Sequence, residues 1–258
     1  MNLTVTHIRK TFQNNGASKT ILRDVSFAVE SGQFVSLVGP SGCGKSTLLT
    51  IIAGFQESTA GEIRLNGGIV SRPGPDRGFV FQEFALFPWM TVRENILFPM
   101  KQMKIPRPDQ TERLQKLLSM AQLEDSEHLY PSQISGGMKQ RTAVLRALAG
   151  DPQVLLMDEP LGAVDHQMRQ ILQEELEALW MKNPTTVIMV THDIEEAIYL
   201  SDRVLVMSAQ KGQIVRELSI DLERPRIRTA PCYLDYKNQL TDVLTADRND
   251  SDQRGTMT

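Results

Sequence analysis

Short runs of apolar residues mark the regular elements of this chain. Four runs are almost wholly apolar, at residues 34–38, 154–157, 186–190 and 204–207. Such runs are typical of strands that are covered on both faces of a parallel sheet. Residues 3–8 and 26–30 instead alternate polar and apolar positions, as half-exposed antiparallel strands do. The pattern predicts an α/β fold with a mostly parallel sheet flanked by helices and an N-terminal antiparallel β subdomain.

Helical periodicity appears between these strands. Residues 167–182 place apolar side chains at helical spacing with glutamates on the opposite face, which predicts an amphipathic crossover helix ending at Asn183-Pro184. Residues 91–100, 111–123 and 139–149 also read as helices, and no comparable strand lies among them. We therefore expect a helical subdomain, at about residues 89–150, inserted into the core domain.

The periodicity fades from Asp221 onward. We expect one domain over residues 1–220 and a short, weakly structured C-terminal tail over residues 221–258.

Composition and charge exclude several classes of protein. The chain has 28 Lys and Arg against 31 Asp and Glu, so 28 − 31 gives a net charge of −3 and no basic field for nucleic acid. Two cysteines, Cys43 and Cys232, are too few for a disulfide framework. The N-terminus lacks a secretory pattern, and no apolar run approaches the ~20 residues that cross a bilayer. We expect a soluble protein that would reach a membrane only through a partner.

A phosphate-binding motif follows the apolar run at residues 34–38. It reads Gly39-Pro40-Ser41-Gly42-Cys43-Gly44-Lys45-Ser46, and Thr47 continues into an apolar-rich segment that predicts a helix. Glycines let backbone amides turn toward phosphates at the positive end of a helix. Lys45 would reach the β- and γ-phosphates, and the Ser46 hydroxyl would bind Mg²⁺. The motif predicts a P-loop NTPase core but names no reaction, and no guanine-binding Asn-Lys-x-Asp supports GTP.

Carboxylates and a histidine follow two other apolar runs. Asp158 and Glu159 come directly after residues 154–157, at the end of a strand where α/β sheets place their ligands. Asp158 would hold Mg²⁺ and Glu159 would polarise the attacking water; a pair of solvated loop acids is the alternative. His192 follows residues 186–190 in the same way, and we expect it to contact the γ-phosphate. The other histidines lack this context.

Residues 134–141 read Ile-Ser-Gly-Gly-Met-Lys-Gln-Arg and resemble the Leu-Ser-Gly-Gly-Gln signature of ATP-binding-cassette (ABC) ATPases. Gln82 resembles the Q-loop glutamine of that family, residues 161–165 resemble its D-loop, and His192 resembles its switch histidine. The resemblance covers about residues 3–218, with the motifs in the family's order.

The resemblance implies two subunits that stack head to tail, as a homodimer or as a heterodimer with a related ATPase. Each subunit would offer its phosphate loop to one ATP and Ser135, Gly136 and Gly137 to the other. Gln82 would sense the metal and the water, and Asp165 would lie at the dimer interface. Phe12 fits the adenine-stacking aromatic, with a strand-end hydrophobe as the alternative.

One departure from the signature narrows the resemblance to a subgroup of the family. Met138 stands in place of the signature's glutamine, and this, with residues 82–92 and 191–197, resembles ATPases of nitrate, sulfonate and taurine importers. Membership would imply transmembrane permease subunits, an extracytoplasmic solute-binding protein and a peripheral place on the cytoplasmic side of the inner membrane. An exporter ATPase and a non-transport ABC ATPase are the alternatives.

Two side features of the sequence concern partners and redox chemistry. Apolar residues follow Gln82 at Phe84, Leu86, Phe87, Pro88 and Trp89, and we expect them to form a cleft for the permease; packing within the chain is the alternative.

Cys43 lies inside the phosphate loop. It is either a redox-sensitive thiol or a small side chain that fills space in the loop.

Overall fold

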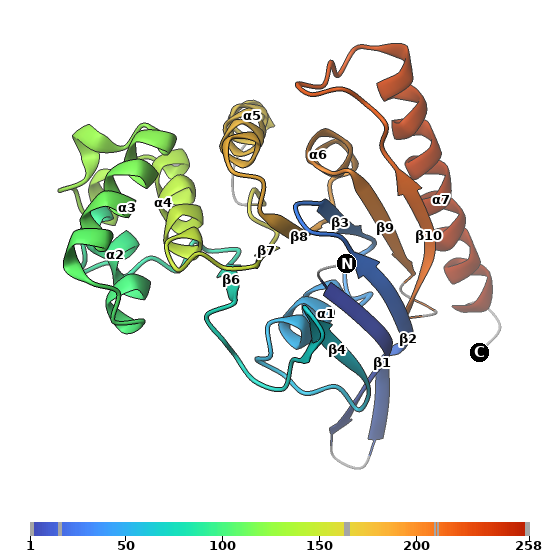
Figure 1. Ribbon diagram of the computed structural model, residues 1–258. Coiled ribbons are helices and arrows are strands. Elements are labelled where there is room, and N and C mark those ends of the chain that lie inside the picture. Colours follow the sequence, from blue (N-terminus) through green and yellow to red (C-terminus); the bar gives the residue numbers. More distant parts are fainter. Residues whose placement is uncertain (1–2, 15–16, 163–165, 209, 211, 256–258) are drawn as a thin grey trace. The chain divides into compact units, whose positions relative to one another are not determined.

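The computed structural model describes residues 3–14, 17–162, 166–208, 210 and 212–255 (Figure 1). The chain forms two compact units. Unit 1 contains residues 1–73 and 188–258, and unit 2 contains residues 74–187. None of the helices in the described residues is both long enough and apolar enough to span a membrane.

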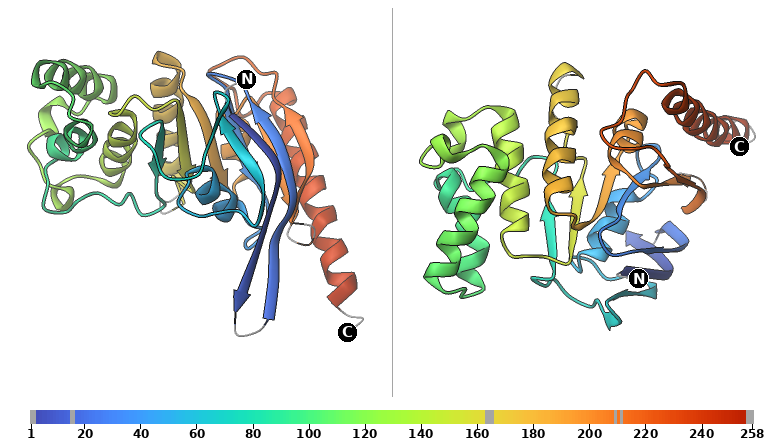
Figure 2. Two further views of the ribbon diagram at one scale, coloured as in Figure 1. Left: turned by 60° about the horizontal axis from the view of Figure 1, so that its bottom comes forward. Right: turned by 45° about the horizontal axis from the view of Figure 1, so that its top comes forward.

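The first sheet of unit 1 is antiparallel. Its strands are β1 (Leu3–Asn14), β2 (Ala17–Val29), β4 (Ala60–Leu65) and β5 (Gly68–Ile69), in the order β2-β1-β4-β5. β1 and β2 form a long hairpin with Leu3 opposite Val29 and Phe12 opposite Lys19 (Figure 2). The predicted antiparallel strands are therefore confirmed, although both are longer than their alternating segments.

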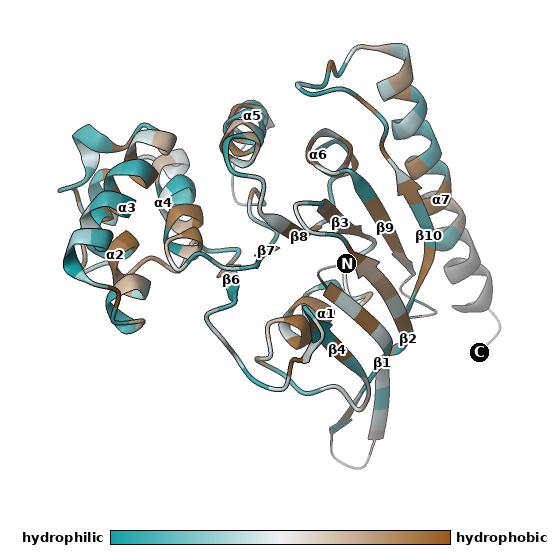
Figure 3. Ribbon diagram, viewed as in Figure 1, coloured by the Kyte–Doolittle hydropathy of each residue, from teal (hydrophilic) through white to brown (hydrophobic). Residues whose placement is uncertain are grey.

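The second set of strands in unit 1 carries the predicted buried runs. It contains β3 (Phe34–Val38), β8 (Thr186–Thr191, of which Ile188 onward belongs to this unit), β9 (Arg203–Ser208) and β10 (Gln213–Ser219). Their order is β10-β9-β3-β8, with β3 and β9 parallel and β9 and β10 antiparallel. Every residue of β3 is buried, and β3, β8 and β9 are coloured as mostly hydrophobic in Figure 3.

The helices of unit 1 are α1 (Lys45–Ile52), α6 (Ile194–Leu200) and α7 (Pro231–Gly255). The expectation of a weakly structured tail is wrong for α7, a helix of 25 residues that contacts α6 and β9 (Figure 1). Its apolar residues are too sparse to give a clear helical period, but Tyr233 and Leu240 are buried. Packing of these two side chains supplies the stability that periodicity alone did not reveal.

Unit 2 combines a pair of strands with a group of helices. β6 (Arg77–Val80) and β7 (Val154–Asp158) pair in parallel. The helices are α2 (Val92–Gln102), α3 (Arg107–Ala121), α4 (Gly136–Leu148) and α5 (His166–Lys182), with short 3₁₀ turns η1 (Glu124–Ser126) and η2 (Pro131–Gln133). Between residues 89 and 150, all of which are described, the chain forms helices and no strand, as expected for the inserted subdomain.

Local chemistry explains where these helices begin. Thr91 caps α2 by accepting from the Glu94 backbone N–H at 3.2 Å, while the Glu94 carboxylate accepts from the Thr91 N–H at 2.9 Å. α3 begins four residues before the predicted helix because Pro108 lies in its first turn, where a missing N–H costs nothing.

Candidate active site

The phosphate-binding motif forms the turn between β3 and α1 in unit 1. Gly42 and Gly44 have φ angles of 81° and 102°, in the left-handed region that favours glycine. Gly44 also leaves no room for a side chain, because a Cβ there would lie 2.7 Å from Leu22 Cδ2. Two of the motif's glycines are thus required by backbone conformation.

Lys45 is the first residue of α1, and its side chain folds back over the loop. The residue is buried, and its Nζ donates to Gly39 O at 2.7 Å and to Pro40 O at 3.1 Å. The first backbone N–H groups of α1 have no acceptor within the helix and carry its positive end. An ammonium group and the first amides of α1 converge on this loop, which therefore has the chemistry of an anion site.

The thiol of Cys43 lies inside the same loop. It is buried, and burial raises its pKa, an effect that the nearby Lys45 charge only partly offsets. A protonated, buried thiol is poorly nucleophilic, so the structure favours the small filler over the redox-sensitive thiol.

Two further predicted residues lie in unit 1. His192 is exposed and directly follows β8, the neighbour of β3 in the sheet, and Asp193 caps the next helix by accepting from the Glu195 N–H at 2.8 Å. Phe12 lies on β1 and is 38% exposed. It pairs across the hairpin with Lys19 on β2, three residues along that strand from Leu22, the residue beside Gly44 of the loop.

The paired carboxylates end β7 in unit 2. Glu159 has a φ of 45°, in the left-handed region that a glutamate rarely adopts. The Gly162 N–H donates to Glu159 O at 3.1 Å and helps to hold this turn. Such a conformation costs about 1–3 kcal/mol and is found most often at functional sites, where it fixes the direction of a side chain.

The signature residues form the start of α4, also in unit 2. Ser135 is the N-cap, and its hydroxyl accepts from the Met138 N–H at 3.3 Å. Gly136 is exposed with open space where a side chain would stand, whereas a Cβ on Gly137 would lie 3.0 Å from Leu172. A hydroxyl and backbone amides at the N-terminus of a 13-residue helix have the chemistry of a second anion site.

Gln82 is exposed and opens the loop of residues 82–91 that leads from β6 to α2. Phe84 and Ala85 both have left-handed φ angles, 58° and 46°. Arg146, in the last turn of α4, donates to Ala85 O at 2.7 Å and to Phe84 O at 3.1 Å, and its guanidinium stacks 5.3 Å from the Phe87 ring centroid. This one arginine therefore holds the strained part of the loop.

Asn95 of α2 fixes the second half of the same loop. Its side chain is fully buried and accepts from the Phe87 N–H at 2.9 Å. Its amide group donates to Phe87 O at 3.2 Å, to Met90 O at 3.0 Å and to Thr91 O at 3.0 Å. Neither Asn95 nor Arg146 is among the residues predicted from the sequence.

An apolar cavity of about 540 Å³ lies beside this loop. Its walls come mainly from β6, the loop, α2 and the end of α4, and include Phe79, Phe81, Phe87, Phe98, Met103 and Arg146. Of the five residues expected to form a cleft only Phe87 lines it, so that expectation is wrong in detail. The other aromatic lining residues are Phe79 on β6, Phe81 just after it and Phe98 on α2, whereas Phe84, Leu86, Pro88 and Trp89 do not line the cavity.

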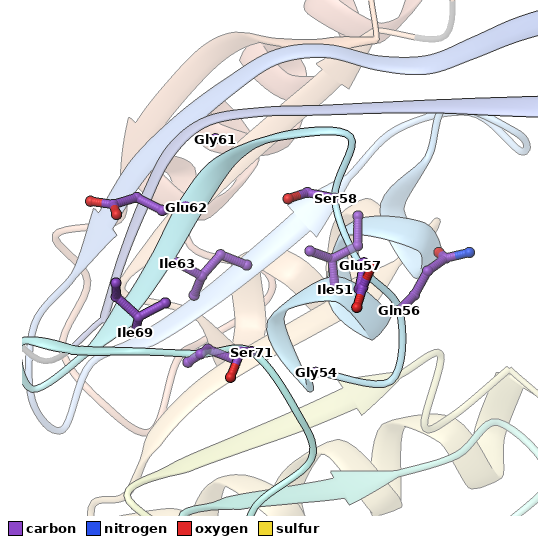
Figure 4. A pocket seen from close by; sticks show the side chains of 11 residues that line it. Ile51, Gly54, Gln56, Glu57, Ser58, Gly61, Glu62, Ile63, Ile69 and Ser71 are labelled. Carbon is purple, nitrogen blue, oxygen red and sulfur yellow. The ribbon is translucent and has the colours of Figure 1, made fainter.

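A second cavity of about 260 Å³ lies in unit 1, away from these motifs (Figure 4). It is bounded by Ile51 and Gly54 at the C-terminal end of α1 and by residues around β4 and β5. The phosphate loop occupies the opposite end of α1, and none of the predicted site residues lines this cavity.

Comparison with known proteins identifies the chain. The family model described as ABC transporter matches residues 22–162. An uncharacterized ABC transporter ATP-binding protein of Methanocaldococcus jannaschii is 46% identical over 94% of this chain and 91% of its own. The aliphatic sulfonates import ATP-binding protein SsuB of Bacillus subtilis is 42% identical (90% and 89%), and the nitrate import ATP-binding protein NrtD of Synechocystis is 41% identical (95% and 95%).

The chain belongs to the ABC transporter family. A solved dimeric ATP-binding cassette in a post-hydrolysis state, bound to ADP and Pi, is similar with a TM-score of 0.72 at 32% identity, over 84% of this chain and 98% of that one. The α/β fold of a P-loop NTPase is therefore confirmed, and the chain is an ATPase of the ABC type that binds ATP.

The predicted site residues of this ABC ATPase are divided between the two units. Unit 1 carries the phosphate loop, His192 and Phe12, and unit 2 carries Gln82, the signature and the paired carboxylates. Asp165 lies outside the described residues. Arg146 and Asn95 could not be predicted, because each binds backbone groups of the 82–91 loop and no residue type in the sequence marks such partners.

Proposed function

We propose that this ABC ATPase powers the uptake of a small anionic solute such as a sulfonate or nitrate. The observation that supports this most is the likeness, over about nine-tenths of both chains, to import ATP-binding proteins for aliphatic sulfonates and nitrate. Met138 in the signature, already associated with that subgroup, agrees with it. The solute itself would be chosen by the partners.

The residues of unit 1 would bind the nucleotide. Residues Gly39, Pro40, Ser41, Gly42, Cys43, Gly44, Lys45, Ser46 and Thr47 would surround the phosphates, with amides and the Lys45 ammonium as donors. Phe12 would stack on the adenine, since its ring is partly exposed. His192 would contact the γ-phosphate from the end of β8.

The residues of unit 2 would supply two of the metal ligands and the base. The Ser46 hydroxyl of unit 1, the Gln82 amide oxygen and the Asp158 carboxylate are hard oxygen donors, the type that Mg²⁺ prefers. When bound, Mg²⁺ would neutralise charge on the β- and γ-phosphates. The Glu159 carboxylate would accept a proton from the attacking water, and the left-handed turn at Glu159 would fix its direction.

We further propose that two such subunits share each nucleotide. The similar solved cassette is dimeric. Ser135, Gly136 and Gly137 present a hydroxyl and backbone amides at a helix N-terminus, which suits the γ-phosphate of an ATP held by the partner's phosphate loop. Asp165 would lie at this interface. The partner is a second copy of the chain or a related ATPase.

The permease would dock at the apolar cavity beside the loop of residues 82–91. Exposed aromatic residues rim this region, with Trp89 69% and Phe81 42% exposed, and grouped exposed aromatics usually mark a partner surface. Phe81 lines the cavity and directly precedes Gln82, so docking there would act next to a proposed metal ligand. The subunit would then sit on the cytoplasmic side of the inner membrane, below an extracytoplasmic solute-binding protein.

Co-purification and transport test this proposal. The tagged chain should retain a membrane-embedded permease when it is extracted in mild detergent. Vesicles containing that complex and its binding protein should accumulate a sulfonate or nitrate only with ATP, and the Lys45→Ala complex serves as the inactive control. Accumulation of neither anion, or export of solute from the vesicles, would contradict the proposed function.

Arg146 should be needed for coupling to the permease. Arg146→Met keeps much of the apolar stem but removes both hydrogen bonds to the strained loop, so we expect permease-stimulated hydrolysis to fall about tenfold or more. Nucleotide affinity should stay unchanged because the phosphate loop lies in the other unit. Arg107→Met, at an exposed position on α3, is the matched control. Full stimulation of the Arg146→Met complex would rule out this role.

A further inference from the structure

The C-terminal segment makes an unusual number of contacts to one short helix of unit 1. Five of its side chains reach α6, which begins two residues after His192. They are Arg224, Arg226, Arg228, Tyr233 and Lys237, and we name them the C-terminal clamp. Four of these five side chains are cationic, although the chain as a whole carries a net negative charge.

Arg226 is the centre of the clamp. It is 5% exposed, and its Nη1 donates to the carbonyls of Ile198, Tyr199 (3.2 Å) and Ser201 (2.7 Å). Arg224 donates to Leu200 O at 2.7 Å. These are the last carbonyls of α6, which have no partner within the helix and carry its negative end. Two guanidinium groups therefore bind the last three carbonyls of α6 and that of its C-cap, Ser201.

The clamp also holds the first turn and the side of α6. The Tyr233 hydroxyl, on a side chain that is otherwise buried, donates to Glu195 O at 2.9 Å, and Lys237 pairs with the Glu195 carboxylate. The Arg228 guanidinium lies 3.8 Å from the centroid of the Tyr199 ring. Burial raises the pKa of Tyr233, so its hydroxyl stays protonated and able to donate.

Isolated helices of seven residues are not stable in water, so the position of α6 depends on what packs against it. Its N-cap, Asp193, is bonded to His192, and the Asp193 N–H donates to the Thr191 hydroxyl at 3.0 Å. A shift of α6 would therefore move the backbone that carries the histidine. Small displacements of this kind are costly for catalysis.

We propose that the C-terminal clamp, with Arg226 at its centre, is a positioning device that sets His192 for ATP hydrolysis. The inference rests on the proposed role of His192 at the γ-phosphate. It assigns a function to residues 224–237, which lie beyond the stretch that matches the family model. Arg226 is a positioning residue, acting through α6 and His192.

The test compares Arg226→Lys with Arg216→Lys, the same change at an exposed position on β10. Lysine keeps the positive charge, but its ammonium group lacks the planar guanidinium geometry that donates to the three carbonyls. We expect Arg226→Lys to lower kcat about tenfold while the Kd for ATP stays within about twofold. Tyr233→Phe removes a single hydroxyl and keeps the buried ring, so it should lower kcat by a smaller factor without loss of folding. An unchanged kcat in both variants, or a parallel loss of ATP affinity, would overturn the inference.

A double-mutant cycle separates this inference from the role of His192. If Arg226 acts through His192, Arg226→Lys should leave the residual single-turnover rate of His192→Ala unchanged. An equal additional loss in that background would overturn the inference and leave the role of His192 intact. A His192→Ala variant with full hydrolysis would instead overturn the proposed role of His192, and the clamp inference with it.

Discussion

Glu159→Gln should nearly abolish ATP hydrolysis while ATP binding is retained. The amide has almost the shape of the carboxylate but cannot take a proton from water, so we expect kcat to fall about 10²–10⁴-fold. The left-handed turn at Glu159 depends on its backbone and on the Gly162 N–H, so the substitution should not disturb it. Steady-state release of phosphate, with nucleotide affinity measured in parallel, checks this prediction.

The same variant should accumulate as an ATP-bound dimer, because ATP would join the two subunits and hydrolysis would release them. Size-exclusion chromatography with ATP and Mg²⁺ measures this directly. Glu174→Gln, the same change at an exposed position on α5, should behave like the unmodified chain. A Glu159→Gln variant that stays monomeric with saturating ATP would contradict the shared site.

Lys45→Ala should lose most of the nucleotide affinity. Hydrogen bonds from a charged group contribute about 1.5–3 kcal/mol each, so losing two contacts to phosphate should weaken binding by about a hundredfold or more. The buried position of Lys45 strengthens the effect, because water screens the ammonium charge poorly there. Titration with a fluorescent ATP analogue measures the affinity.

Thermal unfolding distinguishes lost binding from lost folding in Lys45→Ala. The variant also removes the donor to Gly39 O and Pro40 O, so a modest fall in Tm is expected without nucleotide. Lys116→Ala removes the same charge from an exposed site on α3 and should change neither property. Unchanged ATP affinity in Lys45→Ala would exclude the phosphate-loop assignment.

The elements predicted most accurately are those whose signal is local. Residues 34–38 match β3, and the apolar runs at residues 154–157, 186–190 and 204–207 lie within β7, β8 and β9. A strand that is covered on both faces must be apolar at every position, so its pattern is independent of what lies beside it. α7 was missed because its stability comes from a few buried side chains, such as Tyr233 and Leu240, rather than from a periodic stripe.

The residues of the candidate site likewise fall into those with a local sequence signal and those that depend on tertiary contacts. The phosphate loop is contiguous, and its chemistry depends on glycine conformations and on one lysine beside them. Arg146 and Asn95 were not predicted because each binds carbonyl groups, and every residue of a chain carries a carbonyl. The sequence therefore contains no residue type that would mark their partners.

The sequence alone determined the family, the phosphate loop, the paired carboxylates and the signature, because each is a short run whose residue types have few other uses. Only the tertiary structure decided that Arg146 holds the strained loop after Gln82, that β6 and α2 contribute aromatic side chains to the cavity beside that loop, and that Arg226 binds the last carbonyls of α6. The physical reason is that these interactions join side chains to backbone groups far away in sequence, and such pairs are specified by folding and not by a local pattern.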